Sequence, residues 1–424
     1  MKAIINIRLY DYMTYIESGY VLFDEKIVEV GSMQTLGNPN TLIERADVIY
    51  DGGGKWLMPG LINFHTHVYA TFARGYDFGA RPENFTSVLD QIWWKLDRNL
   101  SMESLYWSSI VYANESLKKG VVGIIDHNAS GTIKGSTAII EKAITEVGIH
   151  GITCFETSER FDVSMAIEEN MEMIRRTNGP FGMHASMTLE DETLTLIGEK
   201  IDGHPIHVHV SESIDDHFAY DETPIQRLDQ AGLISKDSLL VHGVHMTQED
   251  AQLIKMREAV LAICTRSNLN NAVGTVDYSL LRDYQIPVVA GTDGLGVNVA
   301  ASWQDLYFQS KLRSGSPSGV DIGWIKASIV AGYAYYERLT GRKLGRFLPD
   351  FHFDAMLLEY LPYTPIHEKN AFGHVFYGVY ESLDISDLWV GGQQLIKNGE
   401  ILVKRTVSPD VAEGLWQKIG GEDA

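Results

Sequence analysis

Short apolar runs alternate with helix-like segments along most of this chain, and this alternation constrains the fold more than any other feature. The stretches between the runs have a helical composition, as at residues 101–119 and 137–146. Short apolar runs of this kind are typical of buried parallel strands. Eight such runs lie at residues 57–64, 121–126, 151–155, 181–185, 206–210, 238–242, 259–264 and 287–293. The pattern predicts the α/β class, with a (β/α)8 TIM barrel over residues 56–349.

The two ends of the chain have a different pattern. Residues 1–55 and 350–424 contain short strand-like runs separated by turn residues, at 3–8, 18–23, 26–30, 355–359, 388–390, 394–396 and 401–403. The pair Asn398-Gly399 between two of these runs is a strong signal for a β-hairpin. We expect both ends to pair into one small, composite β-sandwich beside the barrel, closed by a helix over residues 409–419.

The charge and the cysteines exclude some classes of protein. The formal net charge is −21 at pH 7, whereas nonspecific binding to nucleic acid or to an anionic membrane needs basic patches. Cys154 and Cys264 lie in apolar runs, which fits buried free thiols in a reducing compartment. No signal peptide or membrane-length apolar run is found. We therefore expect a cytoplasmic protein with a small-molecule substrate and no nucleic-acid or membrane partner. Aromatic residues between Trp93 and Tyr112 leave a homo-oligomer open.

Polar residues gather at the carboxyl ends of the predicted strands. In a barrel of parallel strands these ends meet on one face, which carries the active site. The residues in question are His67, Asp126, His184, His209, His242 and Asp293. Their shared position predicts a single site built from several strands.

Four of the residues near these ends could hold a metal ion. His65 and His67 are two apart on a strand, so their imidazoles point the same way. Imidazole is a common ligand for zinc and iron. His209 supplies a third imidazole and Asp293 an oxygen, which leaves one position open for water. A divalent metal lowers the pKa of such a water to near neutrality. We expect zinc first, with iron or manganese as alternatives.

Two further residues could move protons. Glu212 follows His209 by three residues and is the expected acid/base. The alternative is a carboxylate that stabilises the start of a helix. His242 ends its strand and is favoured for polarising the substrate, whereas His245 is expected to serve the following turn.

These motifs resemble those of the amidohydrolase superfamily, and more closely its mononuclear deaminases and chlorohydrolases of nitrogen heterocycles. The resemblance covers nearly the whole chain in the family order: PGLINFHTH at residues 59–67, HVHVSE at 207–212, VHGVH at 241–245 and GTDG at 291–294. A narrower group, the SsnA-type aminohydrolases, resembles the chain at WWKLDR (93–98), DHNAS (126–130), CFET (154–157) and RSNLNN (266–271).

The resemblance implies residue roles. His65, His67, His209 and Asp293 would ligate the metal, and Glu212 and His242 would handle protons. Asp293 would also accept a proton from the nucleophilic water. Relatives often carry His-Asn where Ile263-Cys264 stand here, which puts a polar contact from that strand in doubt. Residues 181–187 contain no lysine that could bridge two metals, so we expect one ion.

The candidate substrate contacts are His184, Trp94, Asp126 and Asn268. The pair Trp93-Trp94 could stack on a planar substrate or pack a helix. Asp126 could line the mouth of the site or bond loop backbone. Arg74, Glu156 and Arg160 are weaker candidates, because charges on loops are often merely solvated.

The expected activity follows from this set. A metal-bound hydroxide would attack the amidine carbon of a nitrogen heterocycle while Glu212 protonates a ring nitrogen, and ammonia would leave. The same attack could remove a halogen or an alkylamine. A catalytically silent scaffold is the alternative from another class, and the intact ligand set with Glu212 argues against it.

Overall fold

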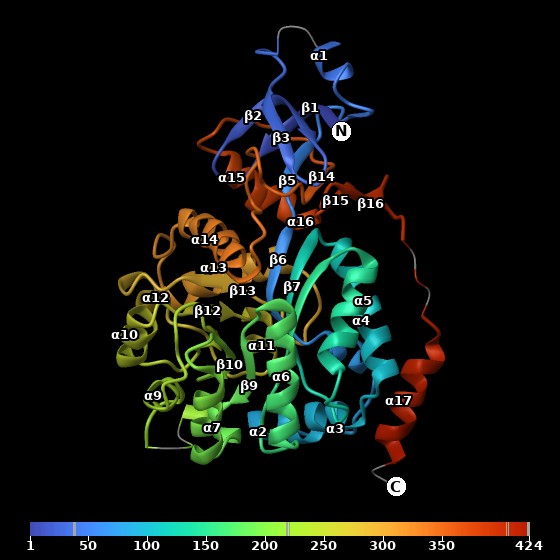
Figure 1. Cartoon of the computed structure of the whole chain (residues 1–424). Coiled ribbons are helices and arrows are strands. Elements are labelled where there is room, and N and C mark those ends of the chain that lie inside the picture. The colour runs from blue at the N-terminus through green and yellow to red at the C-terminus, as the bar shows by residue number, and fades with distance from the viewer. Residues whose placement is uncertain (37–39, 218, 220, 404, 406, 422–424) are drawn as a thin grey trace.

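The predicted strands form two parallel sheets in the computed structural model (Figure 1). The model describes every residue except 37–39, 218, 220, 404, 406 and 422–424. Over the described residues, one sheet has the order β6-β7-β8 and the other β13-β12-β11-β10-β9. The strands are β6 (Leu61–Thr66), β7 (Val121–Asn128), β8 (His150–Phe155), β9 (Phe181–Ala185), β10 (Ile206–Val210), β11 (Leu239–His242), β12 (Val260–Ile263) and β13 (Val288–Ala290).

Parallel bridges connect the edges of these two sheets. Thr66, at the end of β6, pairs with Asp293 just beyond β13, and Thr157, just beyond β8, pairs with Met183 in β9. Within each sheet, neighbouring strands are consecutive in the chain and pair in parallel. Their carboxyl ends therefore face the same way, as the sequence predicted for the α/β class.

Helices separate the strands at most of the expected positions. The helix predicted at residues 101–119 is α4 (Met102–Leu117), which starts at a capping box between Ser101 and Ser104. Others between the strands are α2 (Phe85–Val88), α3 (Trp94–Asn99), α5 (Ser136–Val147), α6 (Val163–Thr177), α7 (Asp191–Ile201), α8 (Ile214–His217), α9 (Pro224–Gln230), α10 (Gln248–Met256), α11 (Thr265–Asn270) and α12 (Tyr278–Asp283). After β13 come α13 (Val299–Ser314), α14 (Ile322–Thr340), α15 (Ala371–His374) and α16 (Tyr380–Ser382).

The chain ends build a separate sheet, seen at the top of Figure 1 with α1 (Asn40–Ile43). Its described strands are β1 (Lys2–Tyr10), β2 (Tyr15–Phe23), β3 (Ile27–Ser32), β4 (Val48–Asp51), β5 (Trp56–Pro59), β14 (Ala355–Leu358), β15 (Ile385–Val390), β16 (Gln393–Lys397) and β17 (Glu400–Ile401). Asn398 and Gly399 have φ of 50° and 77° and connect β16 to β17, as the hairpin signal predicted. A hydrophobic cluster of its own, including Phe23, Phe353 and Trp389, lies within this unit.

The apolar run at residues 57–64 was expected to be one strand, and this expectation is wrong. The run contains β5, which pairs with β14 in the terminal sheet, and β6, which pairs with β7. Gly60 separates the two, and a Cβ atom there would clash with the side chain of Val122. Glycine thus lets the chain pass closely from one sheet into the other.

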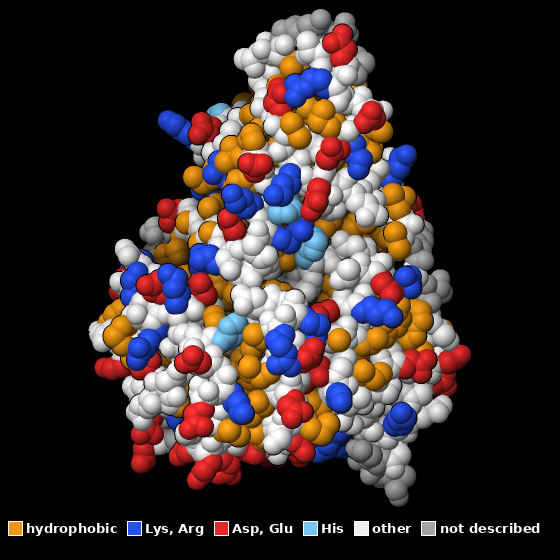
Figure 2. Space-filling model, in the orientation of Figure 1, with side chains coloured by type: hydrophobic (Ala, Val, Ile, Leu, Met, Phe, Trp, Pro, Cys, Tyr) orange, Lys and Arg blue, Asp and Glu red, His pale blue; other side chains and the backbone are white. Residues whose placement is uncertain are grey.

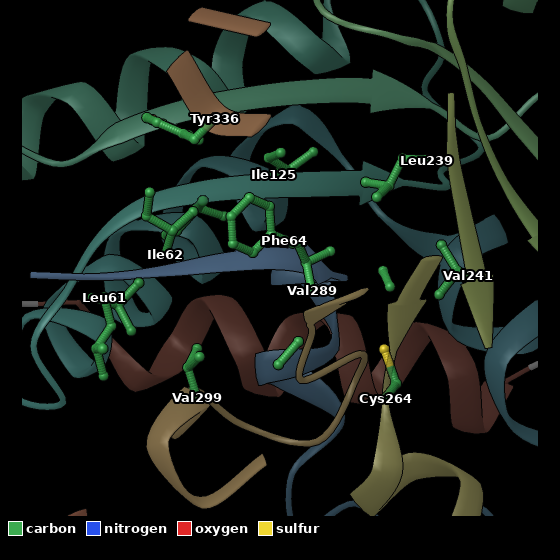
Figure 3. Close-up of a cluster of buried hydrophobic side chains, with 14 of the residues drawn as sticks. Leu61, Ile62, Phe64, Ile125, Leu239, Val241, Cys264, Val289, Val299 and Tyr336 are labelled. Atoms are coloured by element: carbon green, nitrogen blue, oxygen red, sulfur yellow. The ribbon is translucent and has the colours of Figure 1, made fainter. Parts of the chain in front are cut away.

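The main hydrophobic core lies between the parallel strands and the helices that cover them. Figure 3 shows Phe64 of β6, Ile125 of β7 and Val289 of β13 within one buried cluster. Each of these side chains is at most 5% exposed. The core packs below the strand ends and holds them in place for the polar residues above.

The C-terminal helix α17 (Pro409–Gly421) does not close the terminal sheet as expected. It packs instead against α3 and α4, far from that sheet in Figure 1. The indole Nε1 of Trp416 donates a hydrogen bond of 2.7 Å to the carbonyl of Phe72. Amphipathic periodicity predicted the helix but does not specify which surface covers its apolar face.

The surface in Figure 2 carries acidic and basic side chains side by side, without a continuous basic patch on the face in view. Across the described residues, no helix combines the length and the apolar content that crossing a membrane requires.

Candidate metal centre and active site

Four side chains expected to bind a metal converge at the carboxyl ends of β6, β10 and β13. Nε2 of His67 lies 3.0 Å from Oδ1 of Asp293, and Nε2 of His65 lies 3.5 Å from the same oxygen. Nε2 of His65 and Nε2 of His209 are 3.3 Å apart. The four residues span 228 positions of the chain, from His65 to Asp293, and the strand order brings them together.

These distances fit a metal ion. A tetrahedral site with bonds of roughly 2.0–2.1 Å holds its ligand atoms about 3.3 Å apart. The separations of 3.0, 3.3 and 3.5 Å among His65, His67, His209 and Asp293 lie close to that value. Three imidazole nitrogens and one carboxylate oxygen are also the donor types that zinc prefers.

The outer nitrogens of the first two histidines are held by hydrogen bonds. Nδ1 of His67 donates to the carbonyl of His127 at 2.6 Å. Because a carbonyl only accepts, the proton of neutral His67 is on Nδ1 and its Nε2 lone pair faces the site. Nδ1 of His65 lies 2.8 Å from Nε2 of His207. Such partners fix the tautomer and orientation of metal-binding histidines.

Burial and charge set the protonation of this group. Burial lowers the pKa of His65 to about 4 and that of His209 well below its ordinary value. Burial opposes charge on His67 as well, but the hydrogen bond that protonated His67 donates to Asp293 raises its pKa to about 9. Burial would raise the pKa of Asp293, yet its bonds to His65 and His67 hold it well below the usual range. At pH 7 these shifts make Asp293 anionic and His67 protonated, with His65 and His209 neutral.

Glu212 and His242 form a pair beside the metal ligands. Oε2 of Glu212 lies 3.4 Å from Nε2 of His242, and Nδ1 of His242 lies 2.8 Å from Oδ1 of Asn268. Burial, and then the charge of Asp293, raise the pKa of Glu212 well above its ordinary value. At the start of α8 it is the hydroxyl of Ser213 that accepts from the backbone, so a capping role for Glu212 is not supported.

Left-handed backbone recurs at three strand ends of the site. Ser211, His242 and Asp293 have φ of 50°, 77° and 53°, a region that non-glycine residues rarely adopt. Such strain persists where the surrounding structure enforces it, as at functional sites. Of these three residues, His242 and Asp293 line the cavity described below.

A cavity opens onto the centre. Its lining includes the three predicted residues Glu212, His242 and Asp293, with the candidate ligands His67 and His209. The predicted substrate contacts His184 and Trp94 also line it, together with Trp93, Asn270 and Asn271. His245 is outside this lining and bonds the carbonyl of Val273, as expected for a turn residue.

Two predicted substrate contacts lie elsewhere. Asp126 is fully buried outside the cavity lining, and its carboxylate accepts a hydrogen bond of 2.8 Å from the backbone of Val68. Asn268 is likewise outside the lining and bonds His242. Both side chains point to protein partners: Asp126 holds the backbone just after His67, and Asn268 orients His242.

A group that the sequence ranked low lies at the cavity wall. Glu156 and Asp97 line the cavity, and Arg160 bonds both of them, with Nη2 at 2.8 Å from Glu156 and Nη1 at 2.7 Å from Asp97. Glu156 follows β8 directly, in the position where the other strands carry their functional residues. Its position at a strand end could have identified Glu156 as a site residue from the sequence.

The chain is similar in sequence and in structure to known enzymes. A 5-methylthioadenosine/S-adenosylhomocysteine deaminase of Desulfitobacterium hafniense is 28% identical over 327 residues, covering 71% of this chain and 70% of that protein. A zinc-bound adenosine deaminase from Xanthomonas campestris aligns with a TM-score of 0.81 at 18% identity, covering 99% and 98% of the two chains. Atrazine chlorohydrolase TrzN from Arthrobacter aurescens TC1, complexed with zinc, aligns with a TM-score of 0.77 at 18% identity, covering 99% and 100%.

The two structural likenesses show that the chain shares the fold of these enzymes. The sequence model of the amidohydrolase family matches residues 56–395, which include the strands β6 to β13 and the four candidate metal ligands. The resemblance expected from the motifs is thereby confirmed. This chain belongs to the amidohydrolase family and is a hydrolase.

Proposed function

We propose that this protein is an aminohydrolase that removes an amino group from an amidine carbon of a nitrogen heterocycle and releases ammonia. The observation that carries the proposal is the pairing of Glu212 with His242, 3.4 Å apart, in the same cavity as a metal-type donor set. The curated relatives of the chain include enzymes named as deaminases of adenosine derivatives, which supports the same reaction.

His65, His67, His209 and Asp293 would hold one divalent metal ion, with zinc as the first candidate. When bound, such an ion lowers the pKa of a coordinated water and so supplies a nucleophile at neutral pH. Zinc in the Xanthomonas campestris structure supports this choice of ion.

The residues of the chain carry the protons. Water adds to the amidine carbon, and the proton that it loses passes to the carboxylate of Glu212. Glu212 returns that proton to the ring nitrogen, and the bond from carbon to the amino group then breaks. Ammonia leaves with a proton from the added hydroxyl, and the ring keeps a carbonyl. His242 stabilises the oxygen that bears the developing negative charge, held in position by Asn268.

We also propose that the parallel strands close into a (β/α)8 barrel over residues 56–349. The bridges Thr66–Asp293 and Thr157–Met183 at the two sheet edges support this closure. Residues 1–55 and 350–424 would form the composite sandwich, with β5 added to it and α17 lying on the barrel. The free buried cysteines Cys154 and Cys264 support a cytoplasmic location.

A release assay tests the proposed reaction. Zinc-loaded protein is incubated with a panel of aminated purines, pterins, pyrimidines and triazines, and ammonia is measured alongside chloride and alkylamines from matched substituted rings. We expect ammonia from at least one aminated ring. Release of chloride or an alkylamine with no ammonia from any ring would contradict deamination and favour the other displacement.

A further inference from the structure

One wall of the cavity carries more acceptors than the protein itself uses. Asp97 and Glu156 are 1% and 3% exposed, and both line the cavity. They share the single guanidinium of Arg160, whose Nη1 bonds Asp97 and whose Nη2 bonds Glu156. Two acidic side chains therefore share one guanidinium at this wall, and burial raises the pKa of Glu156 to about 7 and that of Asp97 to about 6.

The carboxylates are incompletely satisfied. Oδ1 of Asp97 is buried and has no hydrogen-bond partner in the described structure. Within the same described residues, the one hydrogen bond to the carboxylate of Glu156 comes from Arg160. Nε2 of His184 and Nδ1 of His127 lie 3.6 Å from Glu156, beyond hydrogen-bond distance. Buried acceptors without donors are costly, so a donor from a bound molecule would be favoured here.

Glu156 lies close enough to the candidate metal centre for one heterocyclic ring to contact both. One ligand atom from each of Glu156, His184 and His209 falls within 4.8 Å of the others. A hydrogen bond spans about 2.9 Å, so ring atoms one or two bonds from the reacting carbon can reach Glu156. Trp94, beneath the guanidinium of Arg160 at 4.8 Å, adds an aromatic face to the same wall.

The charge of the wall limits what can bind. Both Nη atoms of Arg160 are engaged by carboxylates, so an anionic substrate group would approach the two acidic side chains Asp97 and Glu156 at this wall. A neutral or cationic ring edge with adjacent N–H groups offers the donors that these oxygens lack. A carboxylate accepts two parallel donors from such an edge.

We propose that Glu156 determines specificity by accepting N–H donors from the ring edge next to the reacting carbon, with Asp97 as a second acceptor. The substrate class is then a planar heterocycle with an amidine or guanidine edge and no anionic group at this end. The proposal rests on the proposed function for the placement of the reacting carbon, and its test measures binding without turnover.

Calorimetric titration of zinc-loaded Glu212→Gln protein provides the test. The ligand pairs are isocytosine against 4-hydroxypyrimidine and 2-aminopurine against purine, which differ only by the amino group that completes the edge. Adenosine against 2′,3′-dideoxyadenosine tests whether a vicinal diol is the donor instead. We expect the amino-bearing ring to bind at least ~10-fold more tightly, as hydrogen bonds to a charged group predict.

Adding Glu156→Gln should reduce this preference to within about twofold, because one acceptor becomes a donor. Adding Asp97→Asn should reduce it less. Glu141→Gln is the matched control, since Glu141 also pairs with an arginine, Arg176, but lies outside the cavity lining. If Glu156→Gln destabilises the fold, Glu156→Asp keeps the charge and withdraws the acceptor.

The proposal is wrong if the preference survives Glu156→Gln or falls equally in Glu141→Gln. It is also wrong if only the diol pair discriminates, or if no donor-bearing ring binds. Ligand discrimination by the Glu212→Gln protein, with no ammonia release by the wild type in the release assay, would retain the specificity role and reject the proposed deamination. Ammonia release by the wild type, with no ligand discrimination by the Glu212→Gln protein, would support deamination and reject the specificity role of Glu156.

Discussion

Nδ1 of His65 lies 2.8 Å from Nε2 of His207, one layer below the candidate metal centre. Nδ1 of His207 in turn lies 3.4 Å from the thiol sulfur of Cys154, whose S–H points to the carbonyl of Asp126 at 3.6 Å. With Nε2 of His65 facing the metal, the donors and acceptors run in one direction along this chain. A histidine and a cysteine thus take the place where a carboxylate often orients a metal ligand.

Removing His207 should weaken metal binding. His207→Ala takes away the acceptor for His65, so the zinc Kd should rise by about 10- to 100-fold, as for other partners of metal-binding histidines. His207→Gln keeps an acceptor and should restore most of the affinity. Competition with a chromogenic chelator measures both. An unchanged Kd in His207→Ala would show that His65 needs no such support.

The cysteine offers a matched pair of substitutions. Cys154→Ser keeps a group that can accept from His207 and donate to Asp126, so its zinc Kd should stay within about threefold of the wild-type value. Cys154→Ala removes that group and should raise the zinc Kd more than Cys154→Ser does. Cys264→Ala is the control, because this second buried cysteine is outside the hydrogen-bond chain. Equal effects of the two alanine substitutions would point to packing alone.

His67→Ala should abolish stoichiometric metal binding. It removes the ligand nearest to Asp293, at 3.0 Å, and leaves that carboxylate with one fewer cation partner. Metal analysis of the purified wild type should give about one divalent ion per chain, and the variant far less. Two ions per wild-type chain, or unchanged content in the variant, would contradict the assigned ligands.

Asn268 should act on the rate through His242. Asn268→Ala removes the partner of Nδ1 and frees the ring to change tautomer, so kcat should fall by about 10- to 100-fold with a smaller change in KM. Asn268→Asp retains an acceptor and should recover most of the rate. A rise in KM alone would instead favour the direct substrate contact that the sequence suggested.

The pH dependence of stability should report on Glu141. Burial raises its pKa from 4.5 to about 7 despite the nearby Arg176, so the folded state favours the protonated carboxyl. The stabilisation is complete below pH 4.5 and is lost as the pH rises to 7, by up to about 3 kcal/mol. Urea unfolding at pH 5 and pH 8 should show a smaller loss of stability in Glu141→Gln than in the wild type. Equal losses would show that Glu141 does not titrate in this way.

The sequence predicted the elements whose pattern is local. Strands β7 to β12 appear where the apolar runs lie. Alternation along the end of β6 and the extended residue after it predicted that His65 and His67 point the same way. The candidate metal ligands could be picked from the sequence because each stands at a strand end, and parallel strands bring their ends together. At these positions the local sequence pattern was enough to predict which residues the fold brings together.

Other features depend on tertiary pairing that no local pattern specifies. The division at Gly60 arises because β5 finds β14 from the other end of the chain. The directions of Asp126 and Asn268 depend on neighbours from other segments. Arg160 joins Glu156, four residues earlier, to Asp97, which is 63 residues away, so the acidic wall emerges only in the fold.

Glu212→Gln tests the central claim most directly, because Glu212 lies outside the candidate ligand set and is the residue proposed to carry the protons. Zinc content and ammonia release are measured on the same preparations of wild type and variant, with a substrate found in the release assay. The proposed function predicts unchanged zinc and a rate lower by about 10²- to 10⁴-fold in the variant. Ammonia release near the wild-type rate, with zinc retained, would contradict it.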